Sequence, residues 1–414
     1  MTDRPFDVLV IGGGLVGLAC ANLMARQVGA SRPSFSVGVV DTNPPAEELP
    51  AEIGLRVSAL SLASRSVLET CGVWAALPAE RVEAYRRMLV WHAAGKPQGP
   101  LSISFDAADQ GEAELGYIVE NELVRWLLWR SAHENDRIRL LTRGRPVQVG
   151  HGPEDLTVTL NDGTTCRARL LVGADGASSW VREQMLVLRT RHDYAQLGIV
   201  LHVATERQHE HAARQRFLPG GPVALLPLPD GRCSVVWSCA ETQARGLLSL
   251  PDAEFGAELT AATDSVLGSL RVTTPRASFP LLRAHADRYC GVRYALIGDA
   301  AHQVHPLAGQ GANLGFLDAA ALAQVLAEHM SVAYADPGDP KALRRFERWR
   351  RGDNQLTLWM MDALHRLFSG NQSSVPRLGG IGLSLVDRTP PLKRRLAEYA
   401  MGKTGDLPRA ARVG

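Results

Sequence analysis

Little net charge, few cysteines and no long apolar run characterise this chain of 414 residues. Its formal net charge is only +2 at pH 7, which excludes the strongly basic surface typical of nucleic-acid-binding proteins. No apolar run approaches the roughly 18 residues that span a bilayer, and the N-terminus leads directly into a strand rather than a signal peptide. The length and the ordinary balance of 45% apolar and 21% charged residues predict a soluble globular protein of two or three units.

The six cysteines are scattered along the chain and form no Cys-x-x-Cys pair. Disulfide frameworks belong to short secreted chains, so we expect buried free thiols in a reducing cytoplasm. His302 and His305 have a spacing that suits one helical face, but the sequence around them does not complete a set of metal ligands. We therefore expect no metal site.

The N-terminal region has the order strand, helix, strand that begins a doubly wound sheet. Apolar strands are expected at 6–11 and 36–40, with a helix rich in Ala and Leu at 15–27 between them. The connecting turn carries Gly12, Gly14 and Gly17. In this arrangement the first glycine permits a tight turn, the second allows a pyrophosphate to approach the helix N-terminus, and the third allows close helix packing.

Asp41 follows the second strand, where an acidic side chain can accept hydrogen bonds from a ribose. It lies further along the chain than usual, and we expect residues 26–35 to absorb the excess as a longer loop. Two later motifs also begin at strand ends. One is 171–176 with Asp175, and the other is 295–315 with Asp299, where a Gly-rich loop opens a long helix. An anionic or electron-rich ring edge at that helix start would be stabilised by the helix dipole.

The region between the first and third motifs contains further strand patterns. Asn161-Asp162-Gly163 predicts a hairpin turn, and strands are expected at 196–203 and 233–239. Because these last two strands lie between two cofactor motifs, we expect them to build a separate sheet. From Lys341 onward the pattern is helical and basic, with 15 Lys and Arg against 6 Asp and Glu.

These motifs, in this order, resemble those of the class A flavoprotein aromatic hydroxylases of the p-hydroxybenzoate hydroxylase fold. The stretch HPLAGQG at 305–311 looks more narrowly like the ubiquinone-biosynthesis hydroxylases, and among them the bacterial 2-polyprenylphenol hydroxylases. LRVSAL at 55–60, YIVEN at 117–121 and the closing AMG at 400–402 extend the resemblance over nearly the whole chain.

The resemblance implies an α/β fold, in which a Rossmann-like FAD-binding domain carries an inserted, mostly β substrate domain and a C-terminal helical region follows. The expected segments are FAD-binding at 1–80, 101–185 and 279–340, substrate-binding at 81–100 and 186–278, and basic and helical at 341–414. The residues expected to bind the cofactor are Gly12, Gly14, Gly17, Asp41, Arg56, Asn121, Asp175, Asp299, Pro306, Gly309, Gln310, Gly311, Ala312 and Asn313. Two of these positions depart from the family pattern: an arginine is commoner than Asn121, and a bulkier apolar residue is commoner than Ala312.

The implied activity is FAD-dependent hydroxylation of the aromatic ring of a polyprenylated phenol in ubiquinone biosynthesis. NAD(P)H would act as a transient co-substrate, and O₂ would react through a flavin hydroperoxide. No side chain is assigned a catalytic role; His302, His305 and His202 are the nearest candidates for a proton relay, and a structural role is favoured for each. The alternatives are a flavin reductase or epoxidase of the same fold acting on an isoprenoid lipid, and a non-catalytic flavoprotein subunit of a quinone-biosynthesis complex. The basic C-terminal region would contact partner proteins or the inner face of the membrane.

Overall fold

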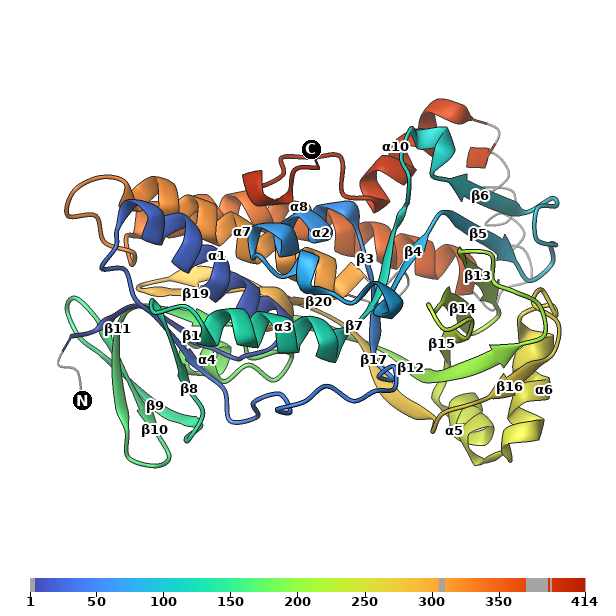
Figure 1. Cartoon of the computed structure of the whole chain (residues 1–414), viewed down its shortest axis with the longest axis horizontal. Helices are drawn as coiled ribbons and strands as arrows, with labels where there is room; N and C mark the ends of the chain where they lie inside the picture. The colour runs from blue at the N-terminus through green and yellow to red at the C-terminus, as the bar shows by residue number, and fades with distance from the viewer. Residues whose placement is uncertain (1–3, 305–309, 370–385, 388, 414) are drawn as a thin grey trace.

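The computed structural model describes residues 4–304, 310–369, 386–387 and 389–413, in which the strands form three sheets. The largest two sheets lie at opposite ends of the molecule, and the long C-terminal helix α8 (Pro340–Ser369) runs from one toward the other (Figure 1). The architecture is therefore the expected α/β fold with a separate sheet inserted between cofactor motifs.

The first sheet is mostly parallel and carries the N-terminal β-α-β unit. Strand β1 pairs in parallel with β11 and β2, and β2 pairs in parallel with β8. Helices α1 and α7 pack against each other beside this sheet, and all these elements share one large apolar core. The strands are β18 (Cys290–Gly291), β19 (Tyr294–Leu296), β11 (Thr165–Gly173), β1 (Phe6–Ile11), β2 (Val37–Val40), β8 (Ile138–Leu141), β10 (Leu156–Leu160) and β9 (Pro146–His151).

The second sheet contains nine of the described strands and pairs mostly antiparallel. Helices α5 and α6 cover one of its faces through a second apolar core. Its strands are β20 (His302–Gln303), β17 (Ala277–Ala286), β12 (Arg189–Thr205), β15 (Cys233–Ala240), β14 (Gly221–Pro227), β13 (Ala212–Leu218), β5 (Arg87–His92), β6 (Ser102–Asp106) and β16 (Leu270–Val272). A third, three-stranded sheet is made of β3 (Val57–Leu60), β7 (Gly116–Glu120) and β4 (Val82–Tyr85).

The helices of the described residues have the following bounds: α1 (Leu15–Ser31), α2 (Leu62–Thr70), α3 (Asn121–His133), α4 (Trp180–Gln184), α5 (Glu241–Ser249), α6 (Asp252–Ala262), α7 (Gln310–Met330), α8 as given above, and α10 (Pro390–Ala400). None of the helices in the described part of the chain is both long and apolar enough to cross a membrane.

The sequence located most elements near the cofactor motifs correctly. The hairpin around Asn161-Asp162-Gly163 is confirmed by the antiparallel pairing of β10 with β11. The long connection before Asp41 was interpreted incorrectly, because α1 continues to Ser31 and absorbs the extra length as helix. All six cysteines are free and buried, as expected. The segment boundaries remain a proposal; sheet membership favours placing β6 and β17 with the substrate segments.

Candidate functional site

Three glycines, two in the turn between β1 and α1 and one in the first turn of α1, are under different constraints. A Cβ on Gly12, whose φ is +108°, would lie 2.4 Å from the carbonyl oxygen of Ala174. A Cβ on Gly17 would lie 2.0 Å from the carbonyl oxygen of Gly12, so both positions need glycine for the fold itself. A Cβ on Gly14 would meet none of the described atoms within 4 Å. Gly14 therefore leaves open space at the N-terminus of α1, where an anionic phosphate is stabilised.

Asp41 fixes this turn from the end of β2. Its Oδ2 accepts a hydrogen bond from the backbone N–H of Gly13 at 2.6 Å, and its Oδ1 accepts one from Asn43 at 2.8 Å. Arg125 of α3 donates to the carbonyl oxygen of Gly13 at 2.8 Å and lies 3.8 Å from the Asp41 carboxylate. We did not identify Arg125 from the sequence, although it lies one helical turn after Asn121.

The second motif places an unpaired carboxylate oxygen close to the glycine turn. Asp175 accepts a hydrogen bond from the backbone N–H of Val181 at 3.1 Å through Oδ2. Its Oδ1 is buried and has no hydrogen-bond partner among the described residues. Burial raises the pKa of the Asp175 carboxyl above its usual value. Arg182 of α4 donates to the carbonyl oxygens of Ala177 and Ala300, so it holds the second motif against the third.

The third motif brings Asp299 together with two residues expected from the sequence. The Asp299 residue retains access to solvent. Because protein atoms surround its carboxyl group and remove part of its hydration, the pKa of Asp299 is raised above its usual value. Interactions with His302 and Arg56 lower this pKa but do not outweigh the desolvation. The carbonyl oxygen of Arg56 accepts a hydrogen bond from the backbone N–H of Asn121 at 2.9 Å. Asn121 in turn accepts one from Ser58 at 2.7 Å. Arg56, Asn121 and Asp299 therefore lie in one neighbourhood, although 243 positions separate the first from the last.

The start of α7 is only partly described. Pro306 and Gly309, like His305, lie outside the described residues, and α7 begins at Gln310. A Cβ on Gly311 would meet none of the described atoms within 4 Å, so this position is as open as Gly14. Ala312 packs against the main apolar core.

Asn313 connects α7 to the third sheet. Its Oδ1 accepts hydrogen bonds from the backbone N–H of Ser61 at 3.0 Å and from the Ser64 hydroxyl at 2.7 Å. Its Nδ2 donates to the carbonyl oxygen of Ala59 at 2.9 Å. The side chain of Asn313 therefore positions α7 on β3 and α2, and a direct cofactor contact of this residue remains a prediction.

A buried polar network lies beneath the third motif and centres on Asp318 of α7. His302 lies 2.5 Å from one carboxylate oxygen, and Arg350 of α8 donates to the other at 2.9 Å. Asn354 and the backbone N–H of Gly298 donate to the same carboxylate. Burial alone would raise the pKa of Asp318, but the charges and hydrogen bonds around it lower the pKa to about 2. We missed this network because buried charges on three separate segments leave no local sequence pattern.

His302 connects the network to the second sheet. Its ring stacks on Tyr289 with centroids 5.9 Å apart, and the Tyr289 hydroxyl lies 3.0 Å from Nε2 of His285. His285 and His302 are register partners in the pairing of β17 with β20. The loop that carries Asp299 therefore supplies the edge strand of the nine-stranded sheet. His302 and His202 are both buried, and nothing in their contacts assigns a catalytic role to either.

One face of the nine-stranded sheet is not covered by α5 and α6. Alternate residues of β12, β14 and β15 pack into the core with α5 and α6, so the intervening residues face the opposite way. Phe279, which contacts Gly198, lies on the same face of β17 as His285. Four apolar side chains on this face are only partly buried: Val200, Ala224, Leu226 and Val236. This face therefore presents a small apolar surface on the side of the sheet opposite α5 and α6.

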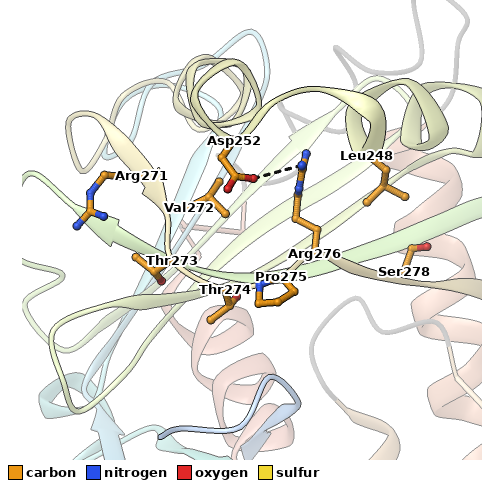
Figure 2. Close-up of a pocket in the computed structure, with 9 residues that line it drawn as sticks. All are labelled: Leu248, Asp252, Arg271, Val272, Thr273, Thr274, Pro275, Arg276 and Ser278. Atoms are coloured by element: carbon orange, nitrogen blue, oxygen red, sulfur yellow. Dashed lines mark ion pairs between the residues drawn. The ribbon is translucent and has the colours of Figure 1, made fainter.

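A cavity of about 820 Å³ lies elsewhere, on the second sheet and its covering helices. It is lined by Leu248, Asp252, residues 271–276 and Ser278, none of which belongs to the glycine motifs. Figure 2 shows Asp252 and Arg276 side by side, joined by an ion pair of 3.2 Å. The Thr273 hydroxyl donates a hydrogen bond to the carbonyl oxygen of His202, and the Thr274 hydroxyl accepts one from the backbone N–H of His202. The side chains of Asp252, Arg276, Thr273 and Thr274 thus have partners within the fold, and we assign this cavity no ligand.

A cluster of Glu83, His209 and His211 has potential metal ligands within 4.8 Å of one another. Both ring nitrogens of His209 are already engaged, Nε2 with the carbonyl oxygen of Leu228 at 3.0 Å and Nδ1 with the backbone N–H of His211 at 3.2 Å. His211 lies 2.5 Å from Glu83 through Nδ1. These contacts explain the cluster without an ion, and the expected absence of a metal remains a prediction.

Comparisons with known proteins agree with the glycine motifs. A family model described as the FAD binding domain matches residues 5–350. The chain is 38% identical to ubiquinone hydroxylase UbiL of Rhodospirillum rubrum, with 97% of this chain and 90% of that protein covered. It is 36% identical to 3-demethoxyubiquinol 3-hydroxylase of Escherichia coli, with 97% and 100% covered. Among solved structures, that of PqsL, a probable FAD-dependent monooxygenase from Pseudomonas aeruginosa, aligns with a TM-score of 0.73 at 26% identity, covering 92% of this chain and 100% of that chain.

Proposed function

Because the chain belongs to the FAD-binding ubiquinone-biosynthesis hydroxylases, and is therefore an FAD-dependent monooxygenase, we propose that its substrate is a polyprenylated phenol. The observation that carries this proposal is the partly exposed apolar row of Val200, Ala224, Leu226 and Val236, which lies on the face of the inserted sheet that α5 and α6 leave uncovered. An apolar aromatic ring that packs on this row would remove its surface from water, which stabilises the complex by about 25 cal/mol per Å² of apolar area buried.

When bound, FAD supplies the reaction chemistry, taking electrons from NAD(P)H and activating O₂ for transfer to the ring. The residues present fit this group. The open space at Gly14 and the N-terminus of α1 would receive the pyrophosphate, and Asp41 would bind the ribose of the adenosine half. Asp299 would accept hydrogen bonds from the ribityl chain, and the open position at Gly311 would let the flavin ring approach α7.

The protein itself contributes positioning and exclusion of water. The network around Asp318 joins the loop of Asp299 to α7 and α8. The apolar row on the nine-stranded sheet would orient the phenol ring toward that loop and keep water from it. We therefore assign no side chain as a nucleophile or general base.

The test is mass spectrometry of the quinone-pathway intermediate that accumulates in cells lacking this protein. A polyprenylated phenol with one hydroxyl too few is the expected result. In the purified enzyme, a phenol should stimulate NAD(P)H consumption. Stimulation only by an unsaturated isoprenoid would favour a reductase or epoxidase, and bound FAD without any turnover would favour a non-catalytic subunit.

We further propose that the enzyme works in the cytoplasm, with its basic C-terminal region at the inner membrane face or against partner proteins. In α10, Leu392, Arg394 and Arg395 are exposed, although Arg394 also pairs with Glu398 at 3.0 Å. Each basic residue near an anionic surface contributes about 1 kcal/mol. Arg350, which the sequence grouped with this region, is buried against Asp318 and takes no part.

Co-sedimentation with anionic liposomes at low salt tests this placement. The wild type should sediment, and a variant with Lys393, Arg394 and Arg395 changed to Glu should not. If the wild type does not sediment with anionic liposomes, direct membrane contact is refuted, and delivery of the substrate would depend on a partner protein.

A further inference from the structure

Residues 42–56, which we call the crossing segment, connect β2 to β3 without a helix or strand of their own. Figure 1 shows this segment in blue, passing below α3 in that view before it reaches β3. It begins directly after Asp41 at the glycine turn. It ends at Arg56, which lies close enough to Asp299 for their charges to interact. The crossing segment therefore runs from the residue expected at the ribose to the neighbourhood expected at the ribityl chain.

Side chains of neighbouring elements hold the crossing segment through its backbone. Arg125 of α3 donates a hydrogen bond to the carbonyl oxygen of Asn43. The indole N–H of Trp126 donates to the carbonyl oxygen of Ala46 at 3.1 Å, and Leu49 packs against the main apolar core. A segment without a helix or a strand ladder of its own opens more readily than the elements beside it. Its position therefore depends on these side chains.

The second half of the crossing segment is held by one ion pair, Arg81 and Glu120, which we call the clamp. The two side chains share two hydrogen bonds of 2.6 Å, and only 13% and 4% of their surface is exposed. The same guanidinium donates to the carbonyl oxygens of Pro50 at 2.6 Å and Glu52 at 3.1 Å. The same carboxylate accepts a hydrogen bond from the backbone N–H of Gly54 at 2.6 Å. Both members of the clamp therefore bind the segment as well as each other.

The clamp lies next to groups expected to face the cofactor. Gly54 comes two residues before Arg56, and Glu120 directly precedes Asn121. The backbone N–H of Asn121 donates to the carbonyl oxygen of Arg56 at 2.9 Å. A buried ion pair contributes little net stability to a fold, because both charges lose their hydration, but its fixed geometry can hold a loop in one position.

We propose that Arg81 and Glu120 are positioning residues that hold the crossing segment closed along bound FAD, and that this closure sets how slowly FAD dissociates. Opening the segment requires the clamp to release the backbone of Pro50, Glu52 and Gly54 together. Closure by a loop commonly limits the release of a bound molecule. The proposal rests on the proposed placement of FAD between Asp41 and Asp299, and it does not depend on which substrate the enzyme hydroxylates.

The test compares FAD release from the FAD-loaded full chain in the wild type and in the clamp variant, Arg81→Gln with Glu120→Gln. Changing both partners avoids the unpaired buried charge that a single substitution would leave. The matched control is Arg293→Gln with Asp336→Asn. Arg293 is also 13% exposed, lies 2.6 Å from Asp336 and donates to the carbonyl oxygen of Arg169 at 3.0 Å. This control pair lies at the opposite end of β19 from Asp299.

Two rates are measured. The rate of FAD dissociation, followed by flavin fluorescence after dilution, should rise roughly tenfold in the clamp variant and less than about twofold in the control. Cleavage of the apoprotein by a glutamyl endopeptidase reports on the segment without flavin, because Glu47, Glu48 and Glu52 are exposed within it. Mass spectrometry should locate cleavage at these residues, faster in the clamp variant than in the wild type or the control.

Three results would overturn the proposal. Wild-type FAD release in the clamp variant would show that the clamp does not retain the cofactor, even if cleavage were faster. Faster FAD release without faster cleavage would show that the segment does not open. Equally faster release in the control would indicate general destabilisation.

If the clamp variant does not fold, Arg81→Lys replaces it, since lysine keeps the charge but lacks the planar guanidinium that bonds both the carboxylate and the segment. Both rates should then rise by a smaller factor, and wild-type rates in this folded variant would also overturn the proposal. Neither measurement uses a phenol, so a negative result would leave the proposed substrate unaffected.

Discussion

The glycine turn offers a substitution that separates cofactor binding from folding. Gly14 has φ −81° and ψ −174°, a conformation open to alanine, and its added Cβ would meet no described atom within 4 Å. Gly14→Ala should therefore cost the apoprotein no more than about 1 kcal/mol, the usual penalty of alanine at a helix N-cap. The same methyl group would occupy the approach of the pyrophosphate. Loss of one hydrogen bond to a charged phosphate is worth about 1.5–3 kcal/mol, or roughly 10- to 150-fold in affinity for FAD.

Two other glycines provide the controls. Gly17→Ala should lower the free energy of unfolding of the apoprotein by at least about 1–3 kcal/mol, because its Cβ would lie 2.0 Å from the carbonyl oxygen of Gly12. Gly246→Ala in α5 is equally open but far from the motifs, and should leave FAD affinity unchanged. The measurements are the thermal unfolding midpoint of each apoprotein and the FAD dissociation constant from flavin fluorescence. Wild-type FAD affinity in Gly14→Ala would refute the placement of the pyrophosphate.

Three further predictions concern the cofactor and the network beneath it. Denaturation of the purified protein should release a yellow cofactor with the mass of FAD, and a colourless, correctly folded protein would refute non-covalent binding. Asp299→Ala should weaken FAD binding by about 1.5–3 kcal/mol, and unchanged affinity would exclude its ribityl contact. The pKa of His285 is lowered to about 4 in the folded protein. Between pH 6.5 and 4 this imidazole is therefore protonated in the unfolded chain but neutral in the folded chain, so the free energy of unfolding should decrease as the pH falls through that range. His285→Gln should make the thermal unfolding midpoint less dependent on pH over that range. A pH dependence equal to that of the wild type would show that this imidazole is not responsible.

The fold and the phosphate-binding end of the site were predictable because their signals are local. Gly12 and Gly17 lie within one turn, and strand periodicity places them between β1 and α1. Asp175 and Asp299 each follow an apolar strand, so the carboxyl ends of β11 and β19 bring them to the same edge of the first sheet.

The rest of the site depends on contacts that no local pattern encodes. Arg125 and Arg350 reach the site from helices whose sequences read as ordinary amphipathic segments, and only tertiary packing brings Arg350 to Asp318. Asn313 follows the family motif, yet its side chain serves the packing of α7 on α2. The length of α1 was misjudged because Gly29 and Ser31 look like loop residues, whereas burial of Val28 and Gly29 keeps them helical.

The central claim is that the enzyme transfers one oxygen atom from O₂ to the ring of a polyprenylated phenol. The most direct measurement is turnover under ¹⁸O₂ with NAD(P)H and a prenylated phenol, followed by mass spectrometry of the product. The account predicts a product that carries one ¹⁸O atom on the ring and no label when H₂¹⁸O replaces ¹⁸O₂. NAD(P)H consumption that yields only hydrogen peroxide, with every phenol recovered unlabelled, would contradict it.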